Sequence, residues 1–136
     1  MPWNLTIQPE PRRLELTFSG RVAPADLRVA AAECIRRAKQ EELWLVLADC
    51  RELEGGHSIF DLHALADFLH TTGLAHRIRE AVLAPEQGQF QEVVRFWETT
   101  CFNRGIQIRL FSDREVALAW LSSFANPADD SRSECA

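Results

Sequence analysis

The amino-acid sequence predicts a single α/β domain in which helices flank a mixed β-sheet, with the element order ββαβαβαβα. Two observations lead to this prediction. Apolar residues alternate along residues 3–8 and 14–18, which is typical of strands with one buried face. Farther along, apolar stripes with helical spacing alternate with short segments typical of strands at 43–48, 78–84 and 106–111. Strands and helices that alternate in this way form a mostly parallel sheet with right-handed crossovers.

The first two strands are expected to form an antiparallel hairpin. Pro9 and Pro11 lie between them and favour a turn, and Gly20 is expected to end the second strand. The hairpin would therefore add an antiparallel edge to the sheet. The alternating apolar residues are Trp3, Leu5 and Ile7 in the first strand and Leu14, Leu16 and Phe18 in the second.

Four helices are expected, over residues 24–41, 59–72 and 89–104 and from Ser112 onward. The last helix begins at Ser112-Asp-Arg-Glu115, which fits a capping box with Ser112 as the N-cap. Each helix has apolar residues at three- and four-residue spacing, as a helix with one buried face requires. These residues are Leu27, Ala30, Ala31, Cys34, Ile35 and Ala38; Ile59, Leu62, Leu65, Ala66 and Leu69; Phe90, Val93, Val94, Trp97 and Cys101; and Val116, Ala117, Trp120, Leu121 and Phe124.

The third strand, at residues 43–48, is expected at the centre of the sheet. It is apolar without alternation, which indicates that both of its faces are covered. Asp49 is expected to end the strand, Gly55 and Gly56 allow a loop with positive φ, and Ser58 begins a helix. Ligand sites in such sheets lie beyond the carboxyl ends of the strands. The passage from Asp49 to Ser58 is therefore the expected site.

Composition and charge argue against several classes of protein. The chain has 136 residues, of which 46% are hydrophobic and 26% charged, and its net charge is −5. Proteins bind nucleic-acid phosphates through basic surfaces, and a net negative charge argues against such a surface. No apolar run approaches the length that spans a bilayer, and the N-terminus lacks a signal-peptide pattern. We expect a cytoplasmic protein that neither binds nucleic acid nor inserts into a membrane.

The four cysteines, Cys34, Cys50, Cys101 and Cys135, are widely spaced. Cys34 and Cys101 lie on apolar helical stripes, where a free cysteine packs as a small hydrophobic residue. A disulfide framework is not expected in a cytosolic domain of this size. We therefore expect four free thiols.

Ser58 has two interpretations. Ser58-Ile-Phe-Asp61 fits the capping-box pattern, in which the hydroxyl accepts a hydrogen bond from a free N–H of the first turn. A phosphate on Ser58 would instead meet the helix dipole and the same free N–H groups. The nearby Asp61 carboxylate would repel that phosphate. The residues themselves favour the helix cap.

Catalysis has little support in the sequence. Asp49 could act as a general base, but a lone carboxylate in such a position more often holds a turn. Cys50 and His57 could form a nucleophile and base if the loop brought them together. No third orienting group is evident, and Glu52 and Glu54 would raise the pKa of the thiol. We expect a protein without catalytic activity and without a cofactor.

A metal site is a further alternative. His63, Asp67 and His70 lie at positions i, i+4 and i+7, so one helical face could present three ligands. The same face borders the apolar stripe, and a solvated helix edge is the more ordinary explanation. No metal ligand is therefore expected.

The aromatic residues also allow two interpretations. Those at helical spacing could line a pocket for an apolar ligand, although core packing is the more common role. These are Phe90, Trp97, Trp120 and Phe124. Others lie off the main stripes, and exposed members would indicate a contact with a protein or a lipid. These are Phe60, Phe68, Phe96 and Phe102.

The order of the elements and three segments resemble the STAS domain, specifically the SpoIIAA-like group that includes the bacterial anti-sigma-factor antagonists. The resemblance extends from Leu14 to Leu121, so residues 1–125 are expected to form this domain and 126–136 a flexible C-terminal tail. The segments are Phe18-Ser-Gly20 at the end of a strand, Leu45-Val-Leu-Ala-Asp49 in the centre, and Ile108-Arg-Leu-Phe-Ser-Asp-Arg-Glu-Val-Ala-Leu-Ala-Trp-Leu121.

The resemblance implies a non-catalytic domain that binds a partner through the loop and helix after the central strand. In the antagonists, a partner kinase phosphorylates a serine at the start of that helix, and Ser58 has this position by spacing. His57, Ile59 and Phe60 differ from the residues usual around that serine. More distant members are compared with lipid-carrying Sec14-like domains, which implies a small apolar ligand as an alternative.

We therefore expect a bacterial regulatory module that binds a protein partner, such as an anti-sigma-like kinase, and a homodimer is compatible with the sequence. The alternative is a small apolar ligand or lipid, bound between the helices at 59–72 and 89–104. Ser58 is the candidate phosphosite. The expected interaction residues are Asp49, Gly55, Gly56, His57, Ser58, Ile59 and Phe60.

Overall fold

The computed structural model describes residues 2–85 and 90–124. The strands are β1 (Trp3–Gln8), β2 (Arg13–Arg21), β3 (Leu45–Gly55), β4 (Arg79–Leu83) and β5 (Gln107–Phe111). The helices are α1 (Pro24–Glu41), α2 (Ile59–Thr71), α3 (Phe90–Phe102) and α4 (Arg114–Ser122), with a short 3₁₀ helix at Ala75–Arg77. These elements confirm the predicted order and the α/β class.

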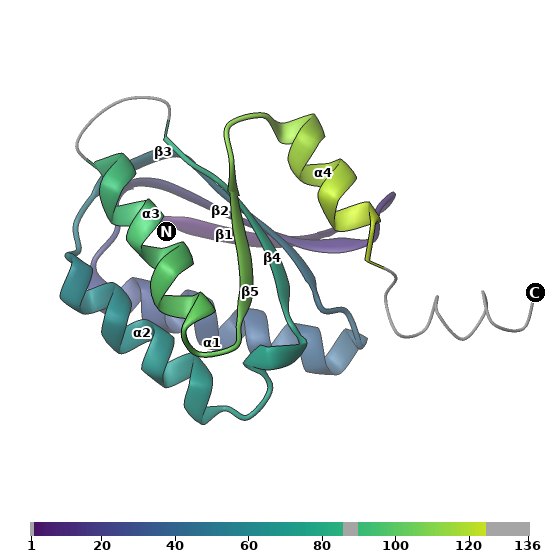
Figure 1. Ribbon diagram of the computed structural model, residues 1–136, viewed down its shortest axis with the longest axis horizontal. Coiled ribbons are helices and arrows are strands. Elements are labelled where there is room, and N and C mark those ends of the chain that lie inside the picture. The colour runs from purple at the N-terminus through teal and green to yellow at the C-terminus, as the bar shows by residue number, and fades with distance from the viewer. Residues whose placement is uncertain (1, 86–89, 125–136) are drawn as a thin grey trace, which may run out of the picture.

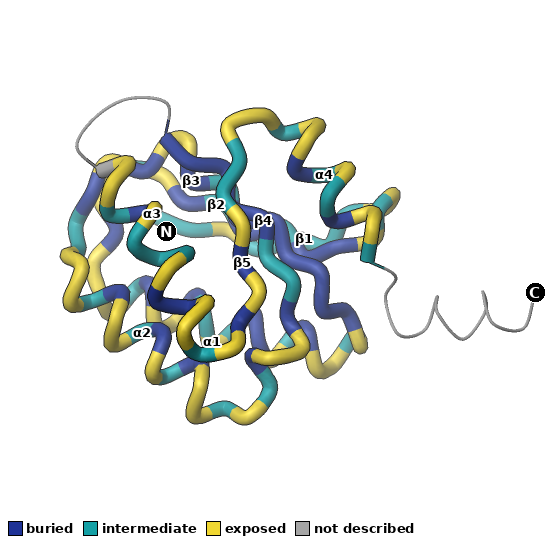
Figure 2. Tube along the Cα trace, in the orientation of Figure 1, coloured by how far each residue is buried: buried dark blue, intermediate teal, exposed yellow. Residues whose placement is uncertain are grey.

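The five strands form one sheet in the order β1-β2-β3-β4-β5. β1 is antiparallel to β2, and β2 to β5 are parallel to one another. Helices α1, α2 and α3 cover one face and α4 covers the other (Figure 1). The larger core lies under the three helices and includes Val46 and Val82, whereas Leu47 and Leu83 belong to the smaller core under α4. Both faces of β3 are therefore covered, as its unbroken apolar run predicts (Figure 2).

The hairpin of β1 and β2 forms as predicted, with Trp3 opposite Phe18 and Ile7 opposite Leu14. A buried arginine holds its turn, which the apolar pattern does not reveal. The Arg13 guanidinium donates to the carbonyl oxygens of Pro9 at 3.1 Å and Pro11 at 3.0 Å. It also donates to Glu15 Oε2 at 3.0 Å. These acceptors compensate in part for the loss of water around the buried cation, whose Nε has no hydrogen-bond partner within the described residues.

The prediction that the central strand ends at Asp49 is wrong. β3 continues to Gly55 because β2 also continues, to Arg21, and the two pair as far as Arg21 with Gly55. The register is irregular at two places along this extension. By contrast, β4 pairs with β3 only up to Asp49. The expected loop of ten residues is thus mostly strand, and only residues 56–58 connect β3 to α2.

The cap of α4 also differs from the prediction. Asp113, not Ser112, is the N-cap, and its Oδ1 accepts from the N–H groups of Glu115 at 2.8 Å and Val116 at 3.3 Å. A carboxylate at this end of a helix also interacts favourably with the helix dipole. The predicted tail at 126–136 lies outside the described residues, as does Cys135. Within the described part of the chain, no helix has both the length and the apolar character needed to cross a bilayer.

Candidate ligand pocket

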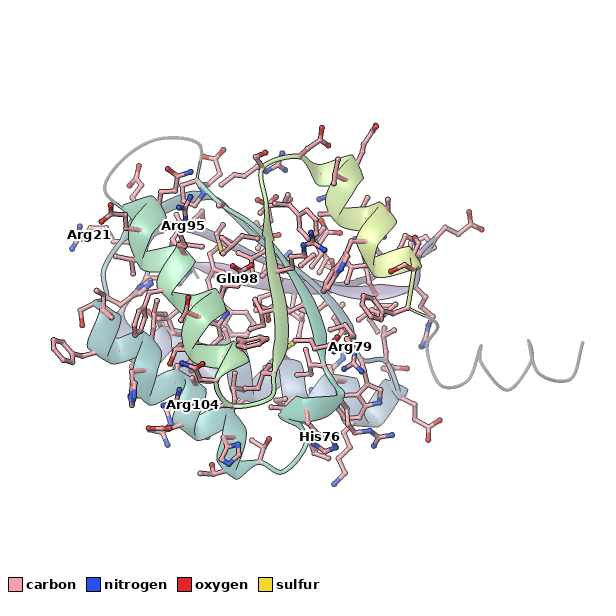
Figure 3. The ribbon with its side chains drawn as sticks, in the orientation of Figure 1. Arg21, His76, Arg79, Arg95, Glu98 and Arg104 are labelled. Carbon is pink, nitrogen blue, oxygen red and sulfur yellow. The ribbon has the colours of Figure 1, made fainter. Side chains whose placement is uncertain are left out.

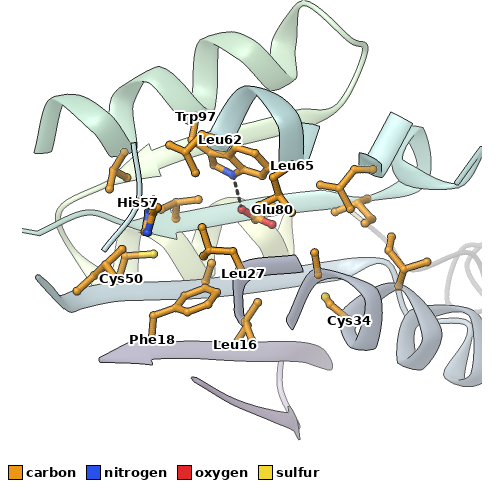
Figure 4. Close-up of a pocket in the computed structure, with 18 residues that line it drawn as sticks. Leu16, Phe18, Leu27, Cys34, Cys50, His57, Leu62, Leu65, Glu80 and Trp97 are labelled. Atoms are coloured by element: carbon orange, nitrogen blue, oxygen red, sulfur yellow. Dashed lines mark hydrogen bonds between the residues drawn. The ribbon is translucent and has the colours of Figure 1, made fainter. Parts of the chain in front are cut away.

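A pocket lies between the sheet and the three helices that cover it (Figure 4). Its volume is about 80 Å³, which exceeds the space that a single buried water requires. Its wall combines residues from β2, β3, β4, α1, α2 and α3, and nearly all of them are apolar. The labelled residues in Figure 4 are Leu16, Phe18, Leu27, Cys34, Cys50, His57, Leu62, Leu65, Glu80 and Trp97.

Strand alternation determines which sheet residues reach the pocket. Ala48 and Cys50 of β3 and Glu80 and Val82 of β4 line it, because side chains two positions apart lie on one face of a sheet. Ala48 from the sheet and Ala31 from α1 are small where larger side chains would fill the space. Small residues on two of the lining elements therefore contribute space to the cavity.

Glu80 is the acidic residue of this wall. Its Oε1 accepts a hydrogen bond of 3.1 Å from the indole N–H of Trp97 (Figure 4). Protein surrounds the carboxyl group of Glu80. The residue is nevertheless only half-buried, because the carboxyl group borders the cavity. Burial raises the pKa of Glu80 to about 7, and the Trp97 hydrogen bond opposes this increase in part. Glu80 was not among the predicted site residues, although an acid between Ile78 and Val82 in a predicted strand was a detectable signal.

His57 and Cys50, considered above as a base and nucleophile, both line this pocket. The His57 ring lies with Nδ1 at 2.9 Å from the carbonyl oxygen of Val22. Burial lowers the pKa of His57, and the Val22 contact and Asp61 oppose this decrease. Burial also raises the pKa of the Cys50 thiol, with Glu80 and Asp49 as further causes. A thiol that stays protonated is a poor nucleophile.

Gly55 and Gly56 both have positive φ, of 130° and 103°, as the sequence predicts. The Gly55 carbonyl oxygen accepts from Val22 N–H at 2.8 Å. A Cβ on Gly56 would lie 2.6 Å from both the nitrogen and the oxygen of Val22. Only glycine therefore allows this approach, which places the next residue, His57, on the pocket wall.

The capping box at Ser58 is confirmed. Ser58 Oγ accepts from Asp61 N–H at 3.3 Å, and Asp61 Oδ2 accepts from Ser58 N–H at 2.7 Å. The hydroxyl of Ser58 also donates to the same carboxylate oxygen at 3.0 Å. Ser58 is exposed, and its phosphorylation stays a prediction.

Asp49 lies within β3 and not beside Ser58. Its carboxylate accepts from the Arg51 guanidinium at 2.8 and 3.0 Å and from Arg51 N–H at 3.1 Å. Burial alone would raise the pKa of Asp49, but these contacts with Arg51 lower it overall. Asp49 alternates with the pocket residues Ala48 and Cys50 and so belongs to the opposite face of the sheet. Asp49 is therefore held in an ion pair away from the pocket.

Arg104 (Figure 3) follows the end of α3 and links that helix to the face of α2 that carries His63 and Asp67. Arg104 Nε donates to Asp67 Oδ1 at 2.8 Å, and Arg104 Nη2 lies 2.9 Å from His63 Nε2. It also donates to the carbonyl and hydroxyl oxygens of Thr100 at 2.8 and 2.7 Å. Across the described residues, no group of three His, Cys, Asp or Glu has metal-ligand geometry. The hydrogen bonds of Arg104 with Asp67 and Thr100 connect the two helices.

The aromatic residues separate into different places. Trp97 lines the pocket, whereas Trp120 and Phe124 pack together under α4 with ring centroids 4.9 Å apart. They do not form one shared pocket, and the side chain of Phe90 lies outside the described residues. Phe60 is 85% exposed and Phe102 is 77% exposed. The other two, Phe68 and Phe96, are half-buried against the larger core.

No protein-family model and no curated protein matches the sequence. Among solved structures, the chain is similar to an uncharacterised protein of the DUF3478 family with a SpoIIAA-like fold, from Shewanella loihica PV-4. The TM-score is 0.57, with 19% sequence identity over 88% of this chain and 93% of the other. The chain therefore has a SpoIIAA-like fold, as the sequence resemblance predicts. At this level of sequence identity, the similarity establishes the fold alone.

Proposed function

We propose that this domain binds a small, mostly apolar ligand in the pocket under α1, α2 and α3. The supporting observation is a cavity of about 80 Å³ whose wall is apolar except for a few polar groups. Small-molecule sites have this composition, because apolar contact gives affinity and a few polar groups fix orientation.

The side chains of the pocket favour a protein that binds its ligand without converting it chemically. The two cysteines on the wall, Cys34 and Cys50, are buried, and burial raises the pKa of both thiols. Burial also lowers the pKa of His57, so its ring stays neutral near neutral pH. No activated nucleophile is thus present among the described residues of the wall.

Filling the pocket is expected to prevent ligand binding. Ala31 lines the pocket from α1, and the next residue, Ala32, is exposed. Ala31→Phe should place a ring in the cavity, whereas Ala32→Phe should leave the cavity unchanged. Each protein is mixed with a small-molecule extract of the source organism and passed through a desalting column. Mass spectrometry then identifies the compounds that remain bound.

The expected result is a compound retained by the wild type and by Ala32→Phe but lost from Ala31→Phe. Circular dichroism checks that all three proteins are folded. Equal retention by both variants would place the ligand elsewhere. No retained compound with the wild type would contradict ligand binding.

A second candidate function is contact with a protein partner through the start of α2. The observation that favours it is the exposure of two adjacent apolar residues, Ile59 at 45% and Phe60 at 85%. Exposed aromatic residues are enriched at protein contact sites. This surface is smaller than the predicted interaction surface, which began at Asp49, because Asp49 lies within β3. It adjoins Ser58, so a phosphate there would lie at its edge.

Phe60→Asp is expected to abolish binding of such a partner. A buried aromatic contact of this kind contributes about 2 kcal/mol or more to binding when it is central to an interface. Binding is measured by affinity capture from the source organism, with the partner identified by mass spectrometry and then tested in purified form. Phe102→Asp is the matched control, because Phe102 is similarly exposed but lies at the end of α3. Equal loss with both variants would show that position 60 is not specific.

A further inference from the structure

We infer that the ligand of this pocket is a compact apolar amine, whose ammonium group pairs with the carboxylate of Glu80. This inference rests on the proposed ligand-binding function and names the chemical class of the ligand. It follows from the charge that lines the cavity, the hydrogen bonds that Glu80 has, and the groups that face it.

The wall of the cavity is acidic without a compensating cation. Glu80 is the carboxyl group on the described wall, and no lysine or arginine is among the residues that line it. The nearest arginine in sequence, Arg79, points to the other side of the sheet, because its guanidinium lies 5.6 Å from the ring centroid of Phe124 under α4. Arg104 is held by Asp67 and Thr100. The described residues that line the cavity therefore offer the Glu80 carboxylate no lysine or arginine partner.

The hydrogen bonds of Glu80 are also incomplete. A carboxylate can accept about four hydrogen bonds. Within the described chain, Glu80 accepts one, from the Trp97 indole at 3.1 Å. An ammonium group brings up to three donors and the missing charge, and charge-assisted hydrogen bonds are shorter and stronger than neutral ones.

The other titratable groups around Glu80 do not supply a positive charge. Cys34 lies on α1, Cys50 on β3 and Cys101 on α3, and burial raises the pKa of each thiol. His57 lies between β3 and α2, and burial lowers its pKa. Near pH 8 these groups are uncharged, while Glu80, with a pKa of about 7, is mostly ionised. The carboxylate would then be the net charge of the site.

Three probes with the same carbon chain test this inference: hexylamine, hexan-1-ol and hexanoate. Binding is measured at pH 8 by NMR, from the resonance of the Trp97 indole N–H, which donates to Glu80. Hexylamine is expected to shift this resonance and to bind about tenfold or more tightly than hexan-1-ol, because it adds a charged hydrogen bond. Hexanoate should not bind, because its charge repels the carboxylate.

Glu80→Gln is the decisive variant because it keeps the shape of the side chain and removes its charge. It should bind hexan-1-ol at least as well as the wild type does and lose the preference for hexylamine. If the wild type binds hexan-1-ol and hexylamine equally, or if Glu80→Gln keeps the preference, the amine inference is wrong while the pocket function stands. If none of the three probes shifts the resonance, both the inference and the proposed function are contradicted.

Discussion

Gly56→Ala is expected to lower the free energy of unfolding by about 3 kcal/mol or more, or to prevent folding. The new Cβ would lie 2.6 Å from the nitrogen and the oxygen of Val22 and 2.9 Å from its carbonyl carbon. These are backbone atoms of a fully buried residue, so they cannot move aside as a flexible side chain could. The φ of 103° is itself unfavourable for alanine, by roughly 1–2 kcal/mol.

Gly73→Ala separates the steric clash from the backbone strain. Gly73 also has a positive φ, of 73°, but nothing lies within 4 Å of a Cβ built on it. This control should lose only about 1 kcal/mol. Urea denaturation followed by circular dichroism measures both variants. Similar losses for the two variants would show that the Val22 backbone accommodates a methyl group.

The close approach of Gly56 to Val22 also has a consequence for the pocket. Val22 N–H donates to the Gly55 carbonyl, and the Val22 carbonyl oxygen contacts His57 Nδ1 at 2.9 Å. The same short segment therefore joins the ends of β2 and β3 and holds one polar residue of the wall. A shift at position 56 should move His57 as well as weaken the fold.

Local patterns in the sequence were sufficient to predict the order of the elements. The capping box of Ser58 and Asp61 and the positive φ of Gly55 and Gly56 follow from residue type at adjacent positions. The length of β3 does not, because it depends on where the separate strand β2 stops. Asp49 and the pair Gly55 and Gly56 indicated a loop, although the strand continues through Asp49 as far as Gly55.

The pocket could not be predicted for a related reason. Its wall combines residues of six elements, among them Ala31 on α1 and Ala48 on β3, and no local pattern shows which distant residues line one cavity. Glu80 was detectable as a polar residue at an inward position of a strand. Its role required Trp97, which comes 17 positions later and donates to it from α3.

The second large effect is expected in the pH dependence of stability, and Glu80 is its source. The folded pKa of this carboxyl is about 7, compared with an ordinary value of 4.5. Below 4.5 it is protonated in both states, so its contribution to stability is fully present. Between 4.5 and 7 the unfolded chain releases the proton that the folded protein keeps, so stability falls as the pH rises. The total loss is about 2–3 kcal/mol, since each pKa unit corresponds to about 1.4 kcal/mol and the cavity gives partial solvent screening.

The difference in unfolding free energy between the wild type and Glu80→Gln isolates this effect. This comparison is needed because His57 affects stability in the opposite direction. Folding lowers the pKa of His57. Its contribution to stability is therefore fully present when the pH is above the ordinary pKa of histidine, and it is lost as the pH falls. Subtracting the variant cancels His57 and every other group that the substitution leaves unchanged. The wild type should lose stability relative to Glu80→Gln from pH 4.5 to 7 and stay level above that.

Glu80→Leu extends this expectation to a gain in stability. At pH 8 the wild type keeps an ionised carboxylate in an apolar cavity, and leucine removes that charge and fills part of the space. The variant should therefore unfold at a higher urea concentration than the wild type at pH 8, with a smaller advantage at pH 4.5, where the carboxyl is protonated. A residue that lowers stability in this way is typical of a binding site, where function opposes stability. A wild type that is more stable than Glu80→Leu at pH 8 would instead make Glu80 a structural residue of the core.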